Sequence, residues 1–454
     1  MSLELLRQVT GWSDPSLASL VGREFSCPCG RTHALPIDTL ATHSGSLQEV
    51  GAFLKRQGAS GVWIIADQIT YEAAGRAVEE ACRASGLAVE PTILPGDPAP
   101  HADREALGRL AFDLQPGRIP LVAVGSGTVC DLARFMAYRT GTFFVAVPTA
   151  PSVDGFTSSV AAMLVDGVRI TYPAAPPRAI FADPAVFARA PHTLIASGYA
   201  EMLGKLTALA DWRLATTLNG EYHCPVAEEL VLEAVRPILS DPSSTSALME
   251  ALLWVGLAML LVGNSRPASG AEHHLAHYWE MRALWEGRDP LLHGLRVGVA
   301  SVLVQRVYGE ILQRRREIVP RLAGHGSRRS PHGTEADIRA WYGPVAERLL
   351  EEHASWSGSS YGPRPLTAPG LAAAGDAVGP YLLPLEAATA FLRKVGAPAL
   401  PHEIGVDPDL VRTSLRAAKE VRHRFTILHL ASELGLLDEV SEALAQEAGR
   451  EVSA

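Results

Sequence analysis

The sequence predicts an α/β N-terminal domain with a doubly wound, mainly parallel sheet, followed by an all-α C-terminal domain. Two observations lead to this fold class. Short apolar runs alternate with helix-like segments through the first part of the 454-residue chain, which is typical of a parallel sheet covered by helices. From about residue 191 the strand-like runs stop, and Ala- and Leu-rich segments with helical periodicity take over. We therefore expect an α/β domain over residues 1–189 and a helical domain over residues 190–454.

The individual elements follow from the same patterns. Strands are expected at residues 61–66, 87–94, 120–124 and 143–147, with helices at about 71–85, 102–114 and 129–138. In the second half, helices are expected at about 193–218, 225–239, 244–262 and 293–313. The apolar stretch 251–262 has only the length of a buried helix, so we expect no membrane insertion.

Composition narrows the classes of function. The net charge is −9 and the isoelectric point about 5.9, without a dense Lys/Arg block, so we expect no nucleic-acid partner. Five cysteines are an odd and sparse set, which fits a reducing compartment better than a disulfide framework. The first residues lack a basic region followed by an apolar core, so the sequence predicts no secretory signal and a cytoplasmic location.

Histidines at helical spacing form the most informative motif. His273 and His277 are four positions apart, where a helix places side chains on one face, and His293 opens the next apolar run. Neutral imidazoles suit zinc, nickel or iron, and Glu201 is the candidate acidic ligand. The alternative is a polar helix face without a metal. His274 points elsewhere on the same helix and is not a candidate ligand.

A glycine turn indicates nucleotide binding. The run Gly125-Ser126-Gly127-Thr128 lies between an expected strand and helix, where free N–H groups can hold a pyrophosphate. It lacks the third glycine of the full dinucleotide fingerprint, and an ordinary tight turn is the alternative. Asp67 ends the first expected strand, where a carboxylate can bind ribose hydroxyls and favour NAD over NADP. Its alternative role is to cap the following helix.

Four motifs together resemble the glycerol-1-phosphate dehydrogenase family. That family belongs to a superfamily with glycerol dehydrogenase, iron-type alcohol dehydrogenases and 3-dehydroquinate synthase, so the resemblance implies a dehydroquinate synthase-like fold. The similarity runs from about Phe25 to Gly435, and the motifs occupy residues 125–128, 148–155, 197–205 and 265–273.

The resemblance implies a ligand set and a cofactor. One divalent ion, zinc, nickel or iron, would be held by Glu201, His273 and His293. NAD(H) or NADP(H) would lie along residues near the glycine turn and the next strand end, which are Gly125, Ser126, Gly127, Thr128, Asp131, Thr149 and Ser152. Asp154 and Lys205 would face the same cleft as catalytic and substrate-binding residues. We also expect a homodimer or larger homo-oligomer.

The implied reaction interconverts dihydroxyacetone phosphate, a small phosphorylated substrate, and sn-glycerol 1-phosphate. Water or His277 would deliver the proton, since imidazole titrates near neutrality. Lys205, Asn264 and Arg266 are the candidates for binding the phosphate. Two alternatives stay open: Lys205 pairs with Glu201 at the i, i+4 spacing, and Arg266 fixes a loop.

Glu201 departs from the family pattern, which usually has Asp as the acidic ligand. A Glu at this place is similar to 3-dehydroquinate synthase, so a lyase and cyclase that uses NAD transiently is an alternative. A non-catalytic homologue is another.

Two further segments resemble parts of this family. Cys27-Pro28-Cys29-Gly30-Arg31-Thr32-His33 supplies three soft ligands, one short of a structural zinc set, and a hairpin turn on Gly30 is the favoured interpretation. The segment Arg422-His423-Arg424 is expected near the substrate, without a more specific role.

Overall fold

The computed structural model describes residues 3–11, 16–114, 117, 119–314, 332–356 and 366–453. Two compact units divide the chain. The first contains Met1–Tyr199 and Cys224–Ser265, and the second contains Ala200–His223 and Arg266–Ala454. The division falls inside the long helix α9 (His192–Asn219), which therefore contributes residues to both units.

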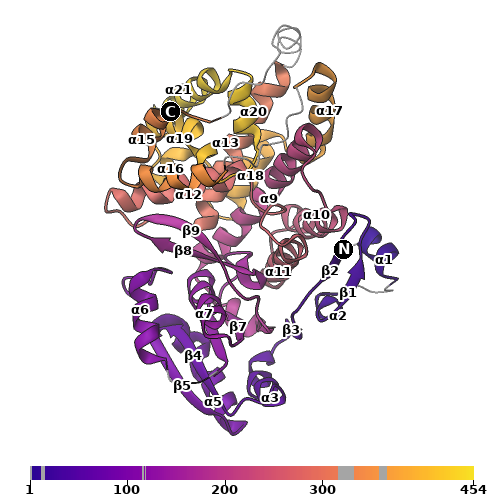
Figure 1. Cartoon of the computed structure of the whole chain (residues 1–454), viewed down its shortest axis with the longest axis vertical. Coiled ribbons are helices and arrows are strands. Elements are labelled where there is room, and N and C mark those ends of the chain that lie inside the picture. Colours follow the sequence, from indigo (N-terminus) through magenta and orange to yellow (C-terminus); the bar gives the residue numbers. More distant parts are fainter. Residues whose placement is uncertain are drawn as a thin grey trace. The chain divides into compact units, whose positions relative to one another are not determined.

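A six-stranded parallel sheet, of which Figure 1 labels β3, β4, β5 and β7, forms the centre of the first unit. Its strand order is β3-β10-β7-β6-β4-β5. Its strands are β3 (Thr39–Ala41), β4 (Gly61–Asp67), β5 (Ala88–Leu94), β6 (Leu121–Gly125), β7 (Phe144–Pro148) and β10 (Ala179–Phe181). The chain runs outward from β4 to β5 and then crosses back to β6 on the other side of β4. The order of strands therefore reverses between β4 and β6, which is where ligands bind in open α/β sheets.

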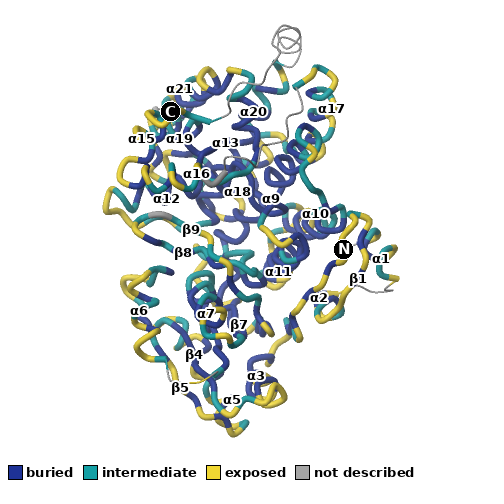
Figure 2. Tube along the Cα trace, in the orientation of Figure 1, coloured by how far each residue is buried: buried dark blue, intermediate teal, exposed yellow. Residues whose placement is uncertain are grey.

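Helices and two small hairpins complete the mixed part of this unit. The helices are α1 (Glu4–Thr10), α2 (Leu17–Leu20), α3 (Val50–Arg56), α4 (Gln68–Thr70), α5 (Arg76–Ala84), α6 (Arg104–Asp113), α7 (Gly127–Thr140) and α8 (Pro184–Phe187). The antiparallel hairpins are β1 (Glu24–Ser26) with β2 (Thr32–Ala34), and β8 (Val160–Val165) with β9 (Val168–Pro173). Figure 2 shows the central strands as buried, and every residue of β6 and β7 is buried.

Two helices from later in the chain belong to the first unit. They are α10 (Pro225–Ser240) and α11 (Thr245–Val262), which pack against each other. The boundary expected at residue 189 stays a prediction, and the two compact units divide the chain at other positions. By length and composition α11 could cross a membrane, but 72% of that apolar window is buried inside the protein, as in a core helix.

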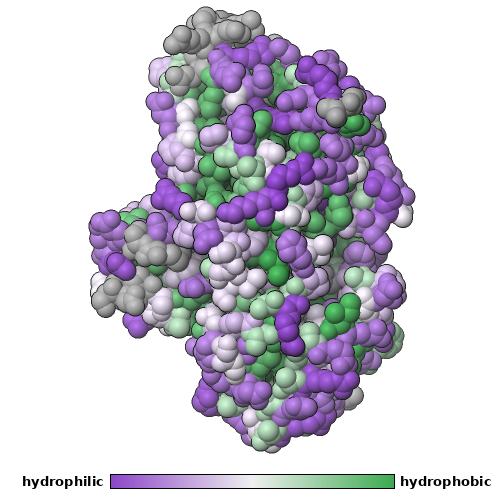
Figure 3. Space-filling model, turned by 180° about the vertical axis from the view of Figure 1, so that it is seen from behind, coloured by the Kyte–Doolittle hydropathy of each residue, from purple (hydrophilic) through white to green (hydrophobic). Residues whose placement is uncertain are grey.

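The second unit is helical in the part that the structure describes. Besides the rest of α9, it contains α12 (Ala271–Trp285), α13 (His293–Gln313), α15 (Glu335–Tyr342), α16 (Ala346–Trp356), α17 (Ala368–Val378), α18 (Leu385–Lys394), α19 (Pro408–Ala417), α20 (Ile427–Glu433) and α21 (Leu437–Ser453). The predicted fold class is confirmed, and the helices expected at 193–218 and 293–313 begin and end within one residue of α9 and α13. On the face drawn in Figure 3, hydrophilic and apolar residues are interspersed.

Candidate functional site

Three helices of the second unit bring the expected metal ligands together. Glu201 lies on α9, His273 on α12, and His293 is the first residue of α13. One ligand atom from each of the three residues lies within 4.8 Å of the other two. Glycines allow the close approach of α9 and α13, because a Cβ on Gly204 would lie 2.6 Å from Val297 Cγ1.

The geometry at the centre of this group is compact and buried. The Nε2 atom of His273 lies 3.1 Å from Oε1 of Glu201, and the Nε2 atom of His293 lies 3.7 Å from Oε2. Glu201 is fully buried, yet its Oε2 atom has no hydrogen-bond partner among the described residues. A buried carboxylate oxygen without a donor is costly, and a divalent cation would satisfy it. The three residues therefore fit a metal ion as one carboxylate and two imidazoles.

Glu272 orients the first histidine and was not predicted. Its Oε1 lies 2.8 Å from Nδ1 of His273, while Thr207 donates a hydrogen bond of 2.9 Å to Oε2. A carboxylate at Nδ1 keeps a proton on that nitrogen, which leaves Nε2, the nitrogen facing Glu201, as the atom that would bind a metal. The signal was available in the sequence, because an acidic residue stands beside His273.

Lys205 makes the ion pair that the sequence offered as an alternative. Its Nζ lies 2.5 Å from Oε1 of Glu201 and donates a hydrogen bond of 3.1 Å to the carbonyl of Ala268, and the lysine is fully buried. Burial alone would raise the pKa of Glu201, but the charges of Lys205 and His273 outweigh it and hold that pKa well below its usual range. Glu201 is therefore a carboxylate, the form that binds a metal.

His277 lies beside the ligand group, and each of its ring nitrogens has a side-chain partner. Its ring stacks on His293 with centroids 5.2 Å apart, and its Nε2 lies 3.2 Å from a terminal nitrogen of Arg422. Its Nδ1 lies 3.4 Å from Oε2 of Glu280. Burial lowers the pKa of His277 to about 3, so the expectation that it titrates near neutrality is not met in this structure.

His274 is turned away from the ligands, as expected from the helix period. It is fully buried, and neither ring nitrogen has a hydrogen-bond partner among the described residues. Burial holds the pKa of His274 well below its usual range, so the ring is neutral.

Arg266 was expected to contact the phosphate or, alternatively, to fix a loop, and its contacts in the structure match the loop role. Its buried guanidinium donates to the carbonyls of Asp211 (3.0 Å) and Phe425 (2.7 Å) and lies 2.8 Å from Oε1 of Glu221. These contacts occupy the group that was expected to bind substrate. The other two expected substrate residues, Asn264 and Asp154, belong to the first unit.

Asp211 holds the beginnings of two helices near the site. Its Oδ2 accepts the N–H of Ala271 at 2.7 Å, at the start of α12, and its Oδ1 accepts the N–H of Ile427 at 2.7 Å, at the start of α20. A carboxylate at a helix N-terminus satisfies free N–H groups and the helix dipole. A Cβ at Gly270 would lie 2.6 Å from this carboxylate, so glycine is required before α12.

Arg422 and Arg424 were named from the sequence without a specific role. Besides the contact of Arg422 with His277, Arg424 donates a hydrogen bond of 2.6 Å to the carbonyl of Ser269. Burial, followed by the nearby charges of Arg266 and Arg422, lowers the pKa of Arg424 to about 9. Positive charge is therefore concentrated beside His277.

The expected nucleotide residues all lie in the first unit, most of them at the strand reversal. Gly125 ends β6, Ser126 precedes α7, and the N–H of Thr149 donates a hydrogen bond of 3.2 Å to the carbonyl of Gly125. Ser126 makes no side-chain cap, so the N–H groups of the first turn of α7 are available to an anion. Gly127 and Thr128 form that first turn, and Ser152 follows β7 in the same loop as Thr149.

Two of the expected nucleotide residues also have structural roles. Asp67 ends β4 on the other side of the reversal and caps α4, with Oδ1 accepting the N–H of Thr70 at 2.7 Å. This is the capping role that the sequence offered as its alternative. Asp131 lies in α7, where its Oδ1 is 3.7 Å from Nε of Arg134. The position of Asp67 is compatible with a ribose, whereas that of Asp131 is explained by the ion pair.

Comparison with known proteins places this geometry in a family. A family model described as iron-containing alcohol dehydrogenase matches residues 41–191. The glycerol-1-phosphate dehydrogenase [NAD(P)+] of Halalkalibacterium halodurans is 40% identical over 293 residues, which cover 62% of this chain and 73% of that protein. The chain belongs to the glycerol-1-phosphate dehydrogenase family. The enzyme of the same name from Geobacillus thermodenitrificans is 31% identical over 438 residues, 93% of this chain and 99% of the relative.

Solved structures agree with this family at the level of the fold. A probable glycerol dehydrogenase from Sinorhizobium meliloti has a TM-score of 0.58 at 16% identity, covering 90% of this chain and 98% of its own. NADH-dependent butanol dehydrogenase A from Thermotoga maritima has a TM-score of 0.56 at 13% identity, covering 90% and 97%. The family model at 41–191 includes the glycine turn but none of the three metal ligands, so the ligand assignment depends on the geometry of the helical unit.

Proposed function

We propose that this protein is a metal-dependent oxidoreductase that uses NAD(H) or NADP(H) to interconvert dihydroxyacetone phosphate and sn-glycerol 1-phosphate. One observation carries the proposal: this chain brings Glu201, His273 and His293 together, and the buried Oε2 of Glu201 has no donor among the described residues. The relatives named for this activity match the chain over nearly its whole length.

The metal would be zinc, nickel or iron, which all accept one carboxylate and two imidazoles. When bound, the ion supplies Lewis-acid stabilisation of the negative charge that develops on the substrate carbonyl oxygen. Glu272 fixes the ring of His273 so that Nε2 faces the site. Lys205 compensates the charge of Glu201 and, by its bond to Ala268, holds the carboxylate in place.

The nucleotide would bind at the strand reversal of the sheet and supply the hydride. The N–H groups at the start of α7 would hold the pyrophosphate, while Asp67 would bind the ribose and disfavour a 2′-phosphate. Because the Asp67 carboxylate already caps α4, we expect a moderate preference for NADH rather than exclusion of NADPH.

The substrate phosphate would bind where positive charge gathers beside His277. Arg422 and Arg424 replace Arg266 in this proposal, because Arg266 is engaged with two carbonyls and Glu221. A phosphate dianion would offset the closely spaced guanidinium charges, and Arg can bind it with two parallel hydrogen bonds. Water would give the proton to the product oxygen, because burial keeps His277 neutral and its Nε2 accepts from Arg422, while Glu280 holds the ring through Nδ1.

A steady-state assay tests the proposal. Purified protein is incubated with dihydroxyacetone phosphate, NADH or NADPH, and Zn²⁺, Ni²⁺ or Fe²⁺ in turn. We expect oxidation of the reduced nucleotide with at least one of these ions, and chiral analysis of the product should give sn-glycerol 1-phosphate. Absence of nucleotide oxidation under all conditions, with a folded protein that binds metal, would contradict the proposal.

Glu201 favours one second candidate, a 3-dehydroquinate synthase-like lyase that uses NAD transiently and returns it unchanged. A phosphorylated seven-carbon sugar acid serves as the discriminating substrate, and its conversion without net NADH turnover would support this candidate. Glu201→Asp separates the two further. If glycerol 1-phosphate is the product, the shorter carboxylate should keep or raise the rate, whereas complete loss would favour chemistry that depends on the longer side chain.

A further inference from the structure

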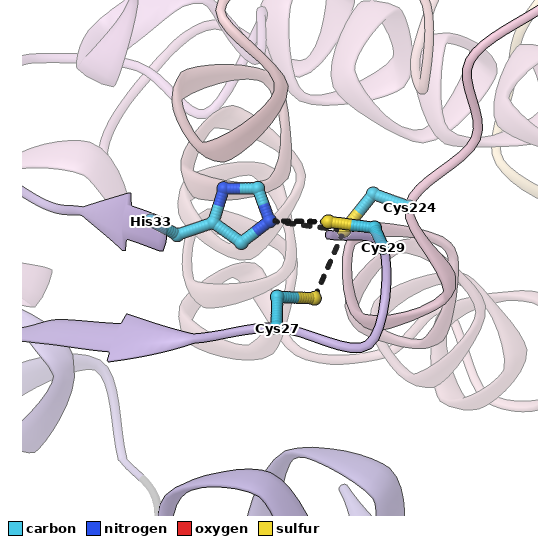
Figure 4. A group of neighbouring side chains, drawn as sticks. All are labelled: Cys27, Cys29, His33 and Cys224. Carbon is cyan, nitrogen blue, oxygen red and sulfur yellow. Dashed lines mark hydrogen bonds between the residues drawn. The ribbon is translucent and has the colours of Figure 1, made fainter. Parts of the chain in front are cut away.

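A second group of metal-binding side chains lies in the first unit. Cys27, Cys29 and His33 come from the β1–β2 hairpin, and Cys224 is the N-cap of α10 (Figure 4). One ligand atom of each of the four lies within 4.8 Å of the other three. The sequence offered three soft ligands in the hairpin. The structure adds Cys224, which lies 191 residues after His33 in the chain.

The distances match the edges of a zinc tetrahedron. Zn–S bonds of about 2.3 Å and Zn–N bonds of about 2.0–2.1 Å imply edges of roughly 3.8 Å between sulfurs and roughly 3.5 Å between sulfur and nitrogen. The Sγ atoms of Cys27 and Cys224 are 3.7 Å apart, and His33 Nε2 lies 3.3 Å from Sγ of both Cys29 and Cys224. A disulfide needs about 2.05 Å, and all these cysteines are free.

The surroundings favour a closed structural site. Cys27, His33 and Cys224 are buried, and Cys29 is half-buried. Figure 4 shows the three sulfurs and the imidazole nitrogen turned toward one another. The ring of His33 also bonds the backbone of Leu261, as a histidine ligand does when a carbonyl holds its other nitrogen.

Backbone groups also hold the ligands in position. The N–H of Ala227 donates to Sγ of Cys224 at 3.5 Å, at the positive end of the 16-residue helix α10, and so opposes the rise in pKa that burial gives this thiol. Gly30 closes the hairpin with φ +86°, a left-handed conformation that favours glycine, and its N–H bonds the carbonyl of Cys27 at 3.0 Å. The favoured hairpin interpretation and the ligand set are therefore parts of one arrangement.

We propose that Cys27, Cys29, His33 and Cys224 form a Cys₃His structural zinc site that fastens the N-terminal hairpin to the start of α10. Four protein ligands leave no open position, which is typical of zinc with a structural role. Three thiolates select a soft or borderline metal over magnesium or calcium. The N-terminal segment depends on the same helix a second time, because Glu229 of α10 accepts the N–H groups of Leu5 and Leu6 at 2.7 and 2.9 Å.

To measure the Cys₃His site alone, the test first removes metal binding at Glu201, His273 and His293. In a His273→Ala background, the full-length protein is expressed with zinc, and metal content is measured after desalting. We expect about one zinc per chain. Replacement by Co²⁺ should give the visible d–d bands of a tetrahedral site together with a thiolate-to-cobalt charge-transfer band. Nitrogen and oxygen ligands alone do not produce that charge-transfer band.

Cys224→Ser is the decisive variant and Cys82→Ser its matched control, because both cysteines are fully buried in the first unit. Cys224→Ser should lose the zinc, the cobalt charge-transfer band and several degrees of melting temperature, whereas Cys82→Ser should keep the zinc and the band. If Cys224→Ser is insoluble, Cys29→Ser provides the same comparison at a half-buried ligand.

Three results would overturn the proposal. They are a His273→Ala protein that holds no zinc and gives no charge-transfer band, a band that survives both Cys224→Ser and Cys29→Ser, and iron in place of zinc in the isolated His273→Ala protein. None of these results would bear on the reduction of dihydroxyacetone phosphate, so the two proposals fail separately.

Discussion

The two ligand groups of this protein differ in chemistry, number and construction. Glu201, His273 and His293 supply three ligands with oxygen and nitrogen atoms, leaving positions for substrate. The group on the hairpin and α10 supplies four ligands, three of them sulfur, and encloses its centre. The first arrangement can exchange an oxygen ligand during a reaction, whereas the second can only hold its metal. Under the two proposals made above, ligand number separates a catalytic metal site from a structural one within a single chain.

The largest expected effect is loss of catalysis on removal of an open-site ligand. His273→Ala should lower kcat/KM by about 10³-fold or more, because the Lewis acid supplies several kcal/mol of transition-state stabilisation and each 1.4 kcal/mol is tenfold. Steady-state kinetics and metal analysis measure the two parts of the effect. The zinc of the Cys₃His group should be unchanged.

His274→Leu is the matched control for that variant. The ring of His274 is buried, and its nitrogens have no hydrogen-bond partner among the described residues, so an apolar leucine can replace it. Metal content and kcat/KM should therefore stay within a few-fold of the parent. Equal losses in both variants would mean that the face of α12 is wrongly assigned.

A chelator should distinguish the two groups by access. Dialysis against EDTA should remove the open-site metal and lower activity by about 100-fold, with little change in melting temperature, and added metal should restore the rate. The metal of the Cys₃His group should leave only after a mercurial blocks its thiols, with a clear fall in melting temperature. Simultaneous loss of both metals to EDTA would contradict the proposed difference.

The sequence could predict the first group because its signal was local. His273 and His277 share a helix face, and the motifs at residues 197–205 and 265–273 resemble a known family, which implies Glu201 and His293 as the other ligands. For the second group the hairpin motif was visible, but Cys224 follows His33 by 191 residues. No spacing rule connects two such positions, because only the packing of the hairpin on α10 brings them together.

The same reason explains why the sequence left the role of Arg266 open between a phosphate contact and a loop contact. Arg266 was a reasonable phosphate ligand from its charge, but the structure commits its guanidinium to Phe425, which is far along the chain and invisible to local pattern. Helix bounds were predictable from periodicity, whereas the hairpin β8–β9 was not predicted. The grouping of α10 and α11 with the sheet unit also depends on tertiary packing, which the change in composition near residue 191 does not report.

The smallest expected effect concerns what holds each histidine ligand. Glu272 at Nδ1 of His273 is a carboxylate, whereas the ring of His33 has a backbone partner. A carboxylate makes the imidazole a stronger ligand and fixes its orientation. Glu272→Gln can keep its one oxygen for the Gly270 N–H and His273 Nδ1, but it removes the charge and puts an amide NH₂ where Thr207 now donates, so metal affinity should fall about 10- to 100-fold.

Competition with a metal indicator measures this affinity, and Glu280→Gln is the control, since Glu280 lies 3.4 Å from His277 rather than from a ligand. Affinity in Glu280→Gln should change less than in Glu272→Gln, although its turnover can fall. Unchanged affinity in Glu272→Gln would mean that position alone, and not charge, makes His273 a ligand. The two groups would then hold their histidines in the same way, and ligand number alone would separate an open centre from a closed one.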